Sequence, residues 1–164
     1  MSGNAPNLLR RSRGFSLVET IITVSVVAVL GSVATPSMTS FMTRHRVQDA
    51  TTDLFVALLK ARSQAIMLNS DVRVQPMGGN WAAGWQVPDP SNPGKYLDVH
   101  GPAEGVDIAM SGATSVTYQF NGRIRTGLGV KFNLSSGALG HVSSACVSVD
   151  PSGRPYTEEK PCVG

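Results

Sequence analysis

One segment constrains this 164-residue chain more than any other. Residues 15–35 are almost entirely apolar, and Arg10, Arg11 and Arg13 precede them. The segment has 21 residues, and a helix of that length spans roughly 30 Å of hydrocarbon. Its one ionisable side chain is Glu19, whose charge costs a few kcal/mol in lipid. Basic residues on the N-terminal side alone predict a cytoplasmic N-terminus, with the C-terminal part outside.

Three interpretations fit an apolar segment behind a basic leader. A cleaved secretory signal needs a small-residue cleavage site after the apolar core, which "VLGSVATPS" supplies loosely. A plain signal anchor explains neither Glu19 nor Gly14. The third interpretation rests on "GFSLVE", residues 14–19, which closely resembles the type IV prepilin motif. A peptidase cuts that motif after the glycine and before a phenylalanine, and the polar, basic leader of residues 1–14 fits the same class.

The resemblance implies roles for the residues around the cut. Gly14 would precede the cleaved bond, and Phe15 would become an N-terminus that the prepilin peptidase methylates. Glu19 would neutralise the amine of Phe15 in a neighbouring subunit, so that a costly buried charge becomes a paired one. Pro36, the twenty-second residue after the cut, stands where the family commonly has a helix-kinking proline. The alternative for Glu19 is a tolerated carboxylate near the membrane interface.

The helical spacing continues after Pro36. Apolar and small residues recur at intervals of three and four and define one face: Val47, Ala50, Thr51, Leu54, Leu58, Ala61, Ala65 and Leu68. We predict one helix from about Phe15 to Leu68, with Pro36 or Gly31 as sites for a bend. Asn69 or the following Ser70-Asp71 would end it.

Short alternating runs separated by glycine and proline follow the helix. The strand candidates are residues 71–77, 81–87, 105–110, 115–120, 129–134 and 145–149, and residues 88–95 are a predicted loop. The predicted fold class is α+β, with a long N-terminal helix packed on an antiparallel β-sheet. We divide the chain into a leader (1–14), a transmembrane or filament-core helix (15–43) and a periplasmic α+β domain (44–164).

The stretch "LLKARSQAIMLNSDVRV" is similar to the helix end that precedes the first strand in the GspH/FimT group. That group comprises minor pseudopilins of type II secretion and minor pilins of type IV pili. The resemblance implies a pilin-like fold and a single-pass inner-membrane protein. It also implies partnership with other pilin or pseudopilin subunits, the prepilin peptidase and the membrane. A plain anchored periplasmic domain and a DNA-binding minor pilin for natural transformation are the alternatives.

Charge and motifs restrict the chemistry. Without the leader, 11 basic residues balance 11 acidic ones, so the high pI is no nucleic-acid signal for the whole domain. No protease, hydrolase or phosphate-loop motif occurs, and His45, His100 and His141 are scattered. We expect no enzyme activity, no cofactor and no metal.

The two cysteines, Cys146 and Cys162, lie 16 positions apart near the C-terminus. In an oxidising periplasm they favour a disulfide, and closing a loop of that length stabilises by roughly 3 kcal/mol. Pilins often close their C-terminal loop in this way. A free pair is the alternative, and a metal site would need more ligands than His141 supplies.

The stretch "FNGRIRTG", residues 120–127, places Arg123 and Arg125 on one side of a predicted strand after a turn. Two arginines on one face can hold phosphates without reading sequence. Some FimT-type minor pilins carry a Gly-Arg-X-Arg motif linked to DNA capture, although nearer the C-terminus, where this chain has Arg154. Lys131 and Arg154 would be neighbours, and a solvated hairpin face is the alternative. We interpret Trp81 and Trp85 as packing residues.

Overall fold

The computed structural model describes residues 15–138 and 140–163, with the side chains of residues 33–37 left undescribed. The chain divides into two compact units, Met1–Ser37 and Met38–Gly164. Helix α1 (Leu17–Met67) continues from one unit into the other, which confirms the prediction of one long helix. The bend at Pro36 or Gly31 stays a prediction.

Helix α1 ends in a left-handed cap. Ser70 N donates to the carbonyl of Ala65 over 3.2 Å, and Asn69 between them has a φ of 48°. Asparagine tolerates this conformation better than most residues with a Cβ. The predicted end of the helix is therefore confirmed, and the chain turns back into the first strand.

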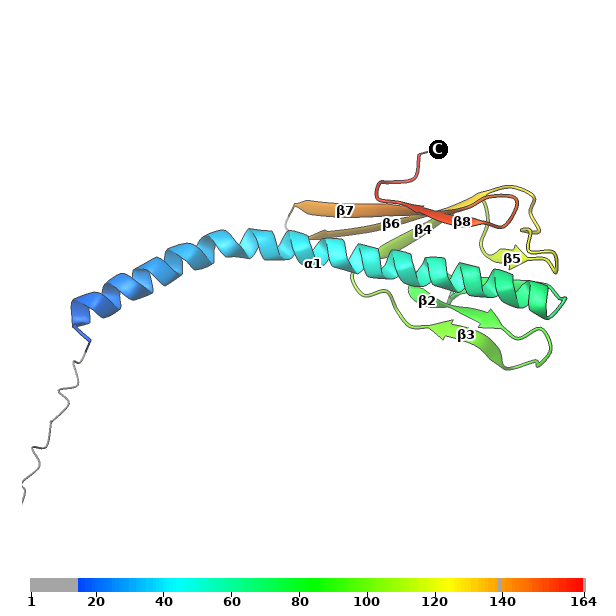
Figure 1. Ribbon diagram of the computed structural model, residues 1–164, viewed down its shortest axis with the longest axis horizontal. Helices are drawn as coiled ribbons and strands as arrows, with labels where there is room; N and C mark the ends of the chain where they lie inside the picture. Colours follow the sequence, from blue (N-terminus) through cyan, green and yellow to red (C-terminus); the bar gives the residue numbers. More distant parts are fainter. Residues whose placement is uncertain (1–14, 139, 164) are drawn as a thin grey trace, which may run out of the picture. The chain divides into compact units, whose positions relative to one another are not determined.

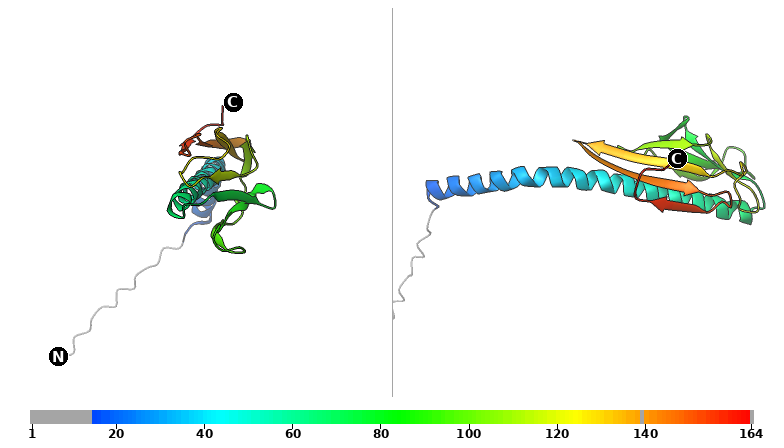
Figure 2. Two further views of the ribbon diagram at one scale, coloured as in Figure 1. Left: turned by 90° about the vertical axis from the view of Figure 1, so that its right-hand side faces the viewer. Right: turned by 90° about the horizontal axis from the view of Figure 1, so that it is seen from above.

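The second unit contains two four-stranded antiparallel sheets (Figure 1). The first has the order β3-β2-β1-β5 and consists of β1 (Val72–Met77), β2 (Asn80–Pro88), β3 (Tyr96–His100) and β5 (Val116–Tyr118). The second has the order β4-β6-β7-β8 and consists of β4 (Asp107–Ser111), β6 (Val130–Ala138), β7 (His141–Val149) and β8 (Pro155–Glu158). Figures 1 and 2 show the second half of α1 lying along both sheets. The α+β prediction is confirmed, with the strands divided between two sheets.

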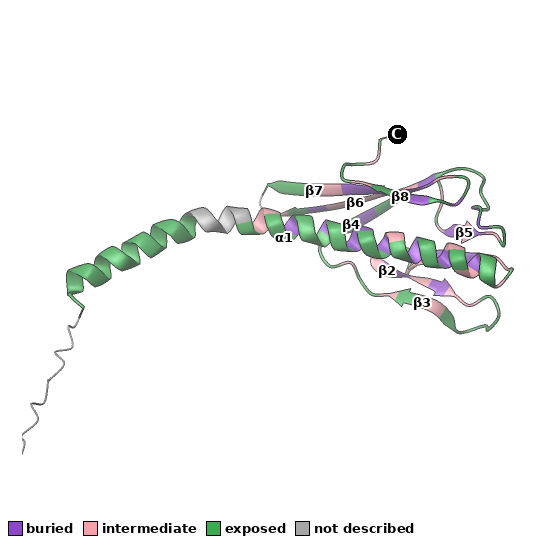
Figure 3. Cartoon of the chain, in the orientation of Figure 1, coloured by how far each residue is buried: buried purple, intermediate pink, exposed green. Residues whose placement is uncertain are grey.

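One apolar core joins the helix to both sheets. Its largest fully buried side chains include Leu54 on α1, Trp85 and Tyr118 in the first sheet, and Phe132 in the second. Figure 3 shows the buried residues recurring along one face of the second half of α1. The predicted stripe is confirmed from Val47 to Ala65, with Ala57 in addition, because a 3.6-residue period keeps these positions on one side.

Two details of the predicted core differ from the structure. Leu68 follows the last residue of α1 and is half-buried. Phe120 is 55% exposed, although it belongs to the strand candidate of residues 115–120. Strand β5 ends at Tyr118, and the turn that follows removes Phe120 from the alternation.

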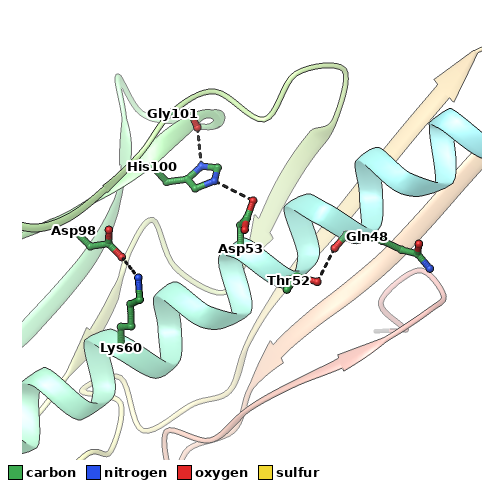
Figure 4. Close-up of polar contacts among 7 residues, drawn as sticks. All are labelled: Gln48, Thr52, Asp53, Lys60, Asp98, His100 and Gly101. Atoms are coloured by element: carbon green, nitrogen blue, oxygen red, sulfur yellow. Dashed lines mark hydrogen bonds and ion pairs between the residues drawn. The ribbon is translucent and has the colours of Figure 1, made fainter.

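Strand β3 was not predicted from the sequence, and polar contacts tie it to α1 (Figure 4). Lys60 Nζ lies 3.4 Å from Asp98 Oδ2, and His100 Nε2 lies 3.1 Å from Asp53 Oδ2. The His100 ring also stacks on Trp85 with 4.1 Å between ring centroids. The packing roles of Trp85 and Trp81 are confirmed, since both are buried.

Candidate functional site

The described N-terminal half of α1 exposes apolar side chains on every side. In residues 15–30, the apolar side chains with more than half of their surface exposed are Phe15, Leu17, Val18, Ile21, Ile22, Val24, Val26, Val27, Val29 and Leu30. Figure 3 shows the start of α1 in the colour of exposed residues. In residues 15–138 and 140–163, none of the helical segments has the length and the apolar character that a membrane span requires. A helix that is apolar all round is normally covered in the functional state of a protein.

The polar side chains of this stretch differ in whether they form hydrogen bonds within the helix. Ser25 and Ser32 each donate to a backbone carbonyl of the preceding turn over 2.7 Å, and Thr20 and Thr23 do the same at slightly longer distances. Glu19 lies in the first turn and is exposed. Within the described residues its carboxylate has no hydrogen-bond or ion-pair partner. If another molecule covers this part of the helix, the charged carboxylate of Glu19 needs a hydrogen-bond or ion-pair partner from that molecule.

The other residues predicted for processing and assembly fall at the limits of the described chain. Gly14 lies outside the described residues. Phe15 lies two residues before the first residue of α1 and is 81% exposed. Pro36 lies inside α1, and its side chain belongs to the undescribed part.

The C-terminal tail is fastened across the outer face of the second sheet. Cys146 on β7 and Cys162 form the predicted disulfide, with 5.0 Å between their Cα atoms. Cys162 N donates to Asn133 Oδ1 over 3.2 Å, and Lys131 Nζ donates to the carbonyl of Val163. Lys131 is thus occupied by the tail and does not join the arginines of residues 120–127.

The arginines lie on the outward face of the first sheet and its extension. Ile124 forms a β-bridge with Tyr118, and Arg125 N donates to Thr117 O over 2.8 Å. Because Tyr118 and Ile124 are buried, Arg123 and Arg125 are exposed on the opposite side. Arg125 forms an ion pair with Asp71.

Arg73 was not among the site residues predicted from the sequence. It lies opposite Thr117 in the pairing of β1 with β5 and is exposed. Val72 and Val74 on either side of it are fully buried, so the Arg73 side chain is on the same outward face as Arg125, with Thr117 between them. The alternation of "VRV" before the turn was the signal that could have identified it.

Arg62, which was also not predicted as a site residue, joins two turns at the end of α1. Its Nε donates to Gly122 O over 3.1 Å, and its Nη2 donates to Ser152 O over 3.4 Å. Gly153, with a φ of 82°, packs so closely that a Cβ there would overlap Gly122 O. This contact brings the turn before Arg154 against the turn before Arg123.

Two titratable groups near these turns have altered pKa values. The Ser152 hydroxyl and then the Arg154 amide, both donating to the carboxylate, hold the pKa of Asp150 below its ordinary value. Burial raises the pKa of Tyr118, partly offset by the positive charge of Arg62. In the part of the chain that the structure describes, no three His, Cys, Asp or Glu residues are grouped as metal ligands.

Comparisons with known proteins agree with this architecture. The profile of the family described as "Type II transport protein GspH" matches residues 50–153, more than half of the chain. The prokaryotic N-terminal methylation motif matches residues 9–35. No curated protein sequence matches.

Two solved structures share the fold. The type IV minor pilin FimU of Pseudomonas aeruginosa aligns with a TM-score of 0.61 at 18% identity, covering 72% of this chain and 92% of FimU. The minor pseudopilin EpsH from the type 2 secretion system of Vibrio cholerae aligns with a TM-score of 0.55 at 10% identity, covering 70% of this chain and 97% of EpsH. The helix packed on antiparallel sheets, the methylation motif and the profile match together show that this chain is a member of the GspH family of minor pseudopilins and minor pilins.

Proposed function

We propose that this chain is a minor subunit of a periplasmic filament, either a type II secretion pseudopilus or a type IV pilus. The subunit enters or caps the filament through the N-terminal half of α1 and so supports secretion or pilus function. The family and the methylation motif at residues 9–35 support this role. Its mechanism is association, with no catalytic step.

In this proposal the subunit begins as an inner-membrane precursor with a cytoplasmic N-terminus. The prepilin peptidase removes residues 1–14 and methylates Phe15. The exposed apolar surface of α1 is then covered first by lipid and later by the helices of neighbouring subunits. The C-terminal unit stays in the periplasm, where oxidation forms the Cys146–Cys162 disulfide.

The observation that carries the proposal is the carboxylate of Glu19, the one charged group on the mainly apolar first part of α1. The nearby hydroxyls are satisfied by their own helix, so covering them costs little. Burying Glu19 without a partner costs several kcal/mol. The positively charged amine of Phe15 in a neighbouring processed subunit can form an ion pair with this carboxylate.

Replacing Glu19 tests this role. Glu19→Val should leave membrane integration intact, because a charge is removed from an apolar segment. The ratio of the variant subunit in sheared filaments to the variant subunit in membranes should fall by more than about tenfold. The reason is that the amine of the neighbouring subunit loses an ion pair worth about 3 kcal/mol or more. Thr20→Val is the matched control, because it removes a neighbouring polar group whose hydrogen bond is internal. Equal incorporation of Glu19→Val and wild type would refute the role of Glu19.

A second candidate function, binding of nucleic-acid phosphates, rests on the arginines of the first sheet. The strand register adds Arg73 to Arg123 and Arg125 on one exposed face, with Asp71 as the acidic neighbour. Two to four phosphate contacts would give weak, sequence-independent binding that falls by roughly one to two decades between about 50 and 200 mM salt.

Full-length protein in detergent should therefore shift duplex DNA at low salt, and the double variant Arg123→Ala/Arg125→Ala should not. The double variant Lys95→Ala/Lys160→Ala removes the same charge elsewhere and should bind as wild type does. Equal loss of binding in both double variants would show that only net charge matters. No binding by wild type at the lower salt concentration would eliminate this function.

A further inference from the structure

Strand β7 has one open edge along its first half. It pairs with β6 over its whole length, from His141 to Val149. On its other side it pairs with β8 only from Cys146 to Val149. Among the described residues, no strand lies beside the edge from His141 to Ala145.

A groove of about 370 Å³ lies along this open edge. Arg44, Val47 and Gln48 of α1 form one wall, and residues 142–145 of β7 form the other. Residues 159–161 of the tail close its end. The space beside the edge is therefore not filled by the helix.

The C-terminal tail stops pairing with β7 after Glu158, where the groove begins. Residues 155–158 pair with β7, and the chain then crosses to the outer face of the sheet, where Cys162 is bonded to Cys146. The crossing buries Cys146 and Ser148, which are 3% and 4% exposed. The disulfide thus holds the tail on the face of the sheet and away from its edge.

The register of β8 can continue along the open edge. Cys146 lies opposite Glu158, so continuation places Ser144 opposite Lys160 and Val142 opposite Cys162. Asp150 N donates to Arg154 O over 3.1 Å, so this pair is a hydrogen-bonded one. Because such pairs alternate along antiparallel strands, the even-numbered residues of β7 and β8 direct their backbone N–H and C=O groups at each other. Ser144, Val142, Lys160 and Cys162 would therefore form the new hydrogen-bonded pairs.

Pro161 does not obstruct this continuation. Like Pro155, which already lies in β8, it has an odd number, so its missing N–H would be directed away from β7. Proline is tolerated at such outward positions of an edge strand. In the continued register Cys162 would lie opposite Val142, four residues along β7 from Cys146, a separation of roughly 13 Å. The disulfide and the extended β8 therefore exclude each other.

We infer that the Cys146–Cys162 disulfide is a switch between two positions of the C-terminal tail. In the oxidised protein the tail covers the outer face of the second sheet and the β7 edge is open. Reduction by a dithiol transfers two electrons and two protons, breaks the sulfur–sulfur bond, leaves two thiols and converts the dithiol to its own disulfide. The released residues 159–163 then extend β8 along β7 and fill the groove beside α1.

Amide hydrogen exchange of the full-length protein in detergent, read by NMR with and without dithiothreitol, tests the switch. In the oxidised state the amides of Val142 and Ser144 face the open edge and should exchange fast. Reduction should slow both by at least about tenfold. The amides of Ser143 and Ala145, which face β6, should stay protected in both states. Unchanged exchange at Val142 and Ser144, or faster exchange throughout β6–β8, would overturn the inference.

Proline substitutions separate the proposed pairing from a general effect of reduction. In the background Cys146→Ser/Cys162→Ser, the amides of Val142 and Ser144 should already be protected. Adding Lys160→Pro removes an N–H directed at β7 and should restore fast exchange, whereas adding Glu159→Pro alters only an outward position and should not. Identical behaviour of the two proline variants would contradict the proposed register.

A covalent trap gives an independent readout. In the double variant Cys146→Ser/Val142→Cys, the new cysteine would lie opposite Cys162 at a distance compatible with a disulfide. Mild oxidation should link the peptides that contain positions 142 and 162, as detected by mass spectrometry. Failure to form this link in a folded protein would count against the extended tail.

Discussion

At the scale of single residues, Tyr118 combines burial with a hydroxyl that has no hydrogen-bond partner within the described structure. Burial raises its pKa above the ordinary value near 10. The folded protein therefore retains the phenolic proton at a pH where the unfolded chain has lost it. The stability that depends on this proton is fully present below about pH 10 and is lost as the pH rises further.

Tyr118→Phe should reveal this dependence. At pH 7 the variant should be as stable as wild type or more stable by about 1 kcal/mol, because a buried unsatisfied hydroxyl is removed. Above about pH 10, wild type should lose up to about 1.4 kcal/mol per pH unit more than the variant. Urea unfolding across this pH range measures both effects, and Tyr96→Phe at a half-exposed position is the control. Parallel curves for wild type and Tyr118→Phe would contradict the prediction.

At the scale of elements, two turns meet beside the end of α1. Arg62 donates to both turns, and Gly153 of one lies against Gly122 of the other. Gly153→Ala should destabilise the second unit for two reasons. The left-handed φ costs about 1–2 kcal/mol for a residue with a Cβ, and the overlap with Gly122 O adds to that cost.

Gly140 offers a matched control for Gly153→Ala. It has the same φ of 82°, but no heavy atom lies within 4 Å of the position of a Cβ. Gly140→Ala should therefore show the conformational cost alone, and urea unfolding should find Gly153→Ala clearly less stable. Equal losses in the two variants would mean that the turns do not need their close contact.

At the scale of the whole molecule, the proposed function requires proteolytic processing. Intact-mass analysis of protein from its native host should show the loss of residues 1–14 and one added methyl group on Phe15. Gly14→Val should leave the chain at full length, because the peptidase site accepts a small residue there. Ser12→Val in the leader is the control and should be processed normally. A mature N-terminus beyond Pro36 would exclude the prepilin interpretation.

The sequence predicted the elements whose signals are periodic along the chain. The stripe from Val47 to Ala65 identified the buried face of α1. Alternation identified residues 129–134 as a strand, and Val130, Phe132 and Leu134 are buried there in β6. The strands that it missed, β3 and β8, are short and lack this alternation. β3 depends on its pairing with β2 and on contacts of Asp98 and His100 with α1. Such contacts join residues that are distant in sequence and have no local pattern.

The sequence by itself determined the prepilin motif, the long helix with Glu19 as its one acidic residue before Pro36, and the α+β order of elements, because each depends on neighbouring residues. Only the tertiary structure decided how the arginines are used: Arg62 joins two turns, Arg125 pairs with Asp71, and Arg73 joins the exposed face. It also decided that the tail crosses the sheet instead of extending β8. The physical reason is that ion pairs, tight packing of backbones and strand register depend on which distant segments meet, and that is established only when the core forms.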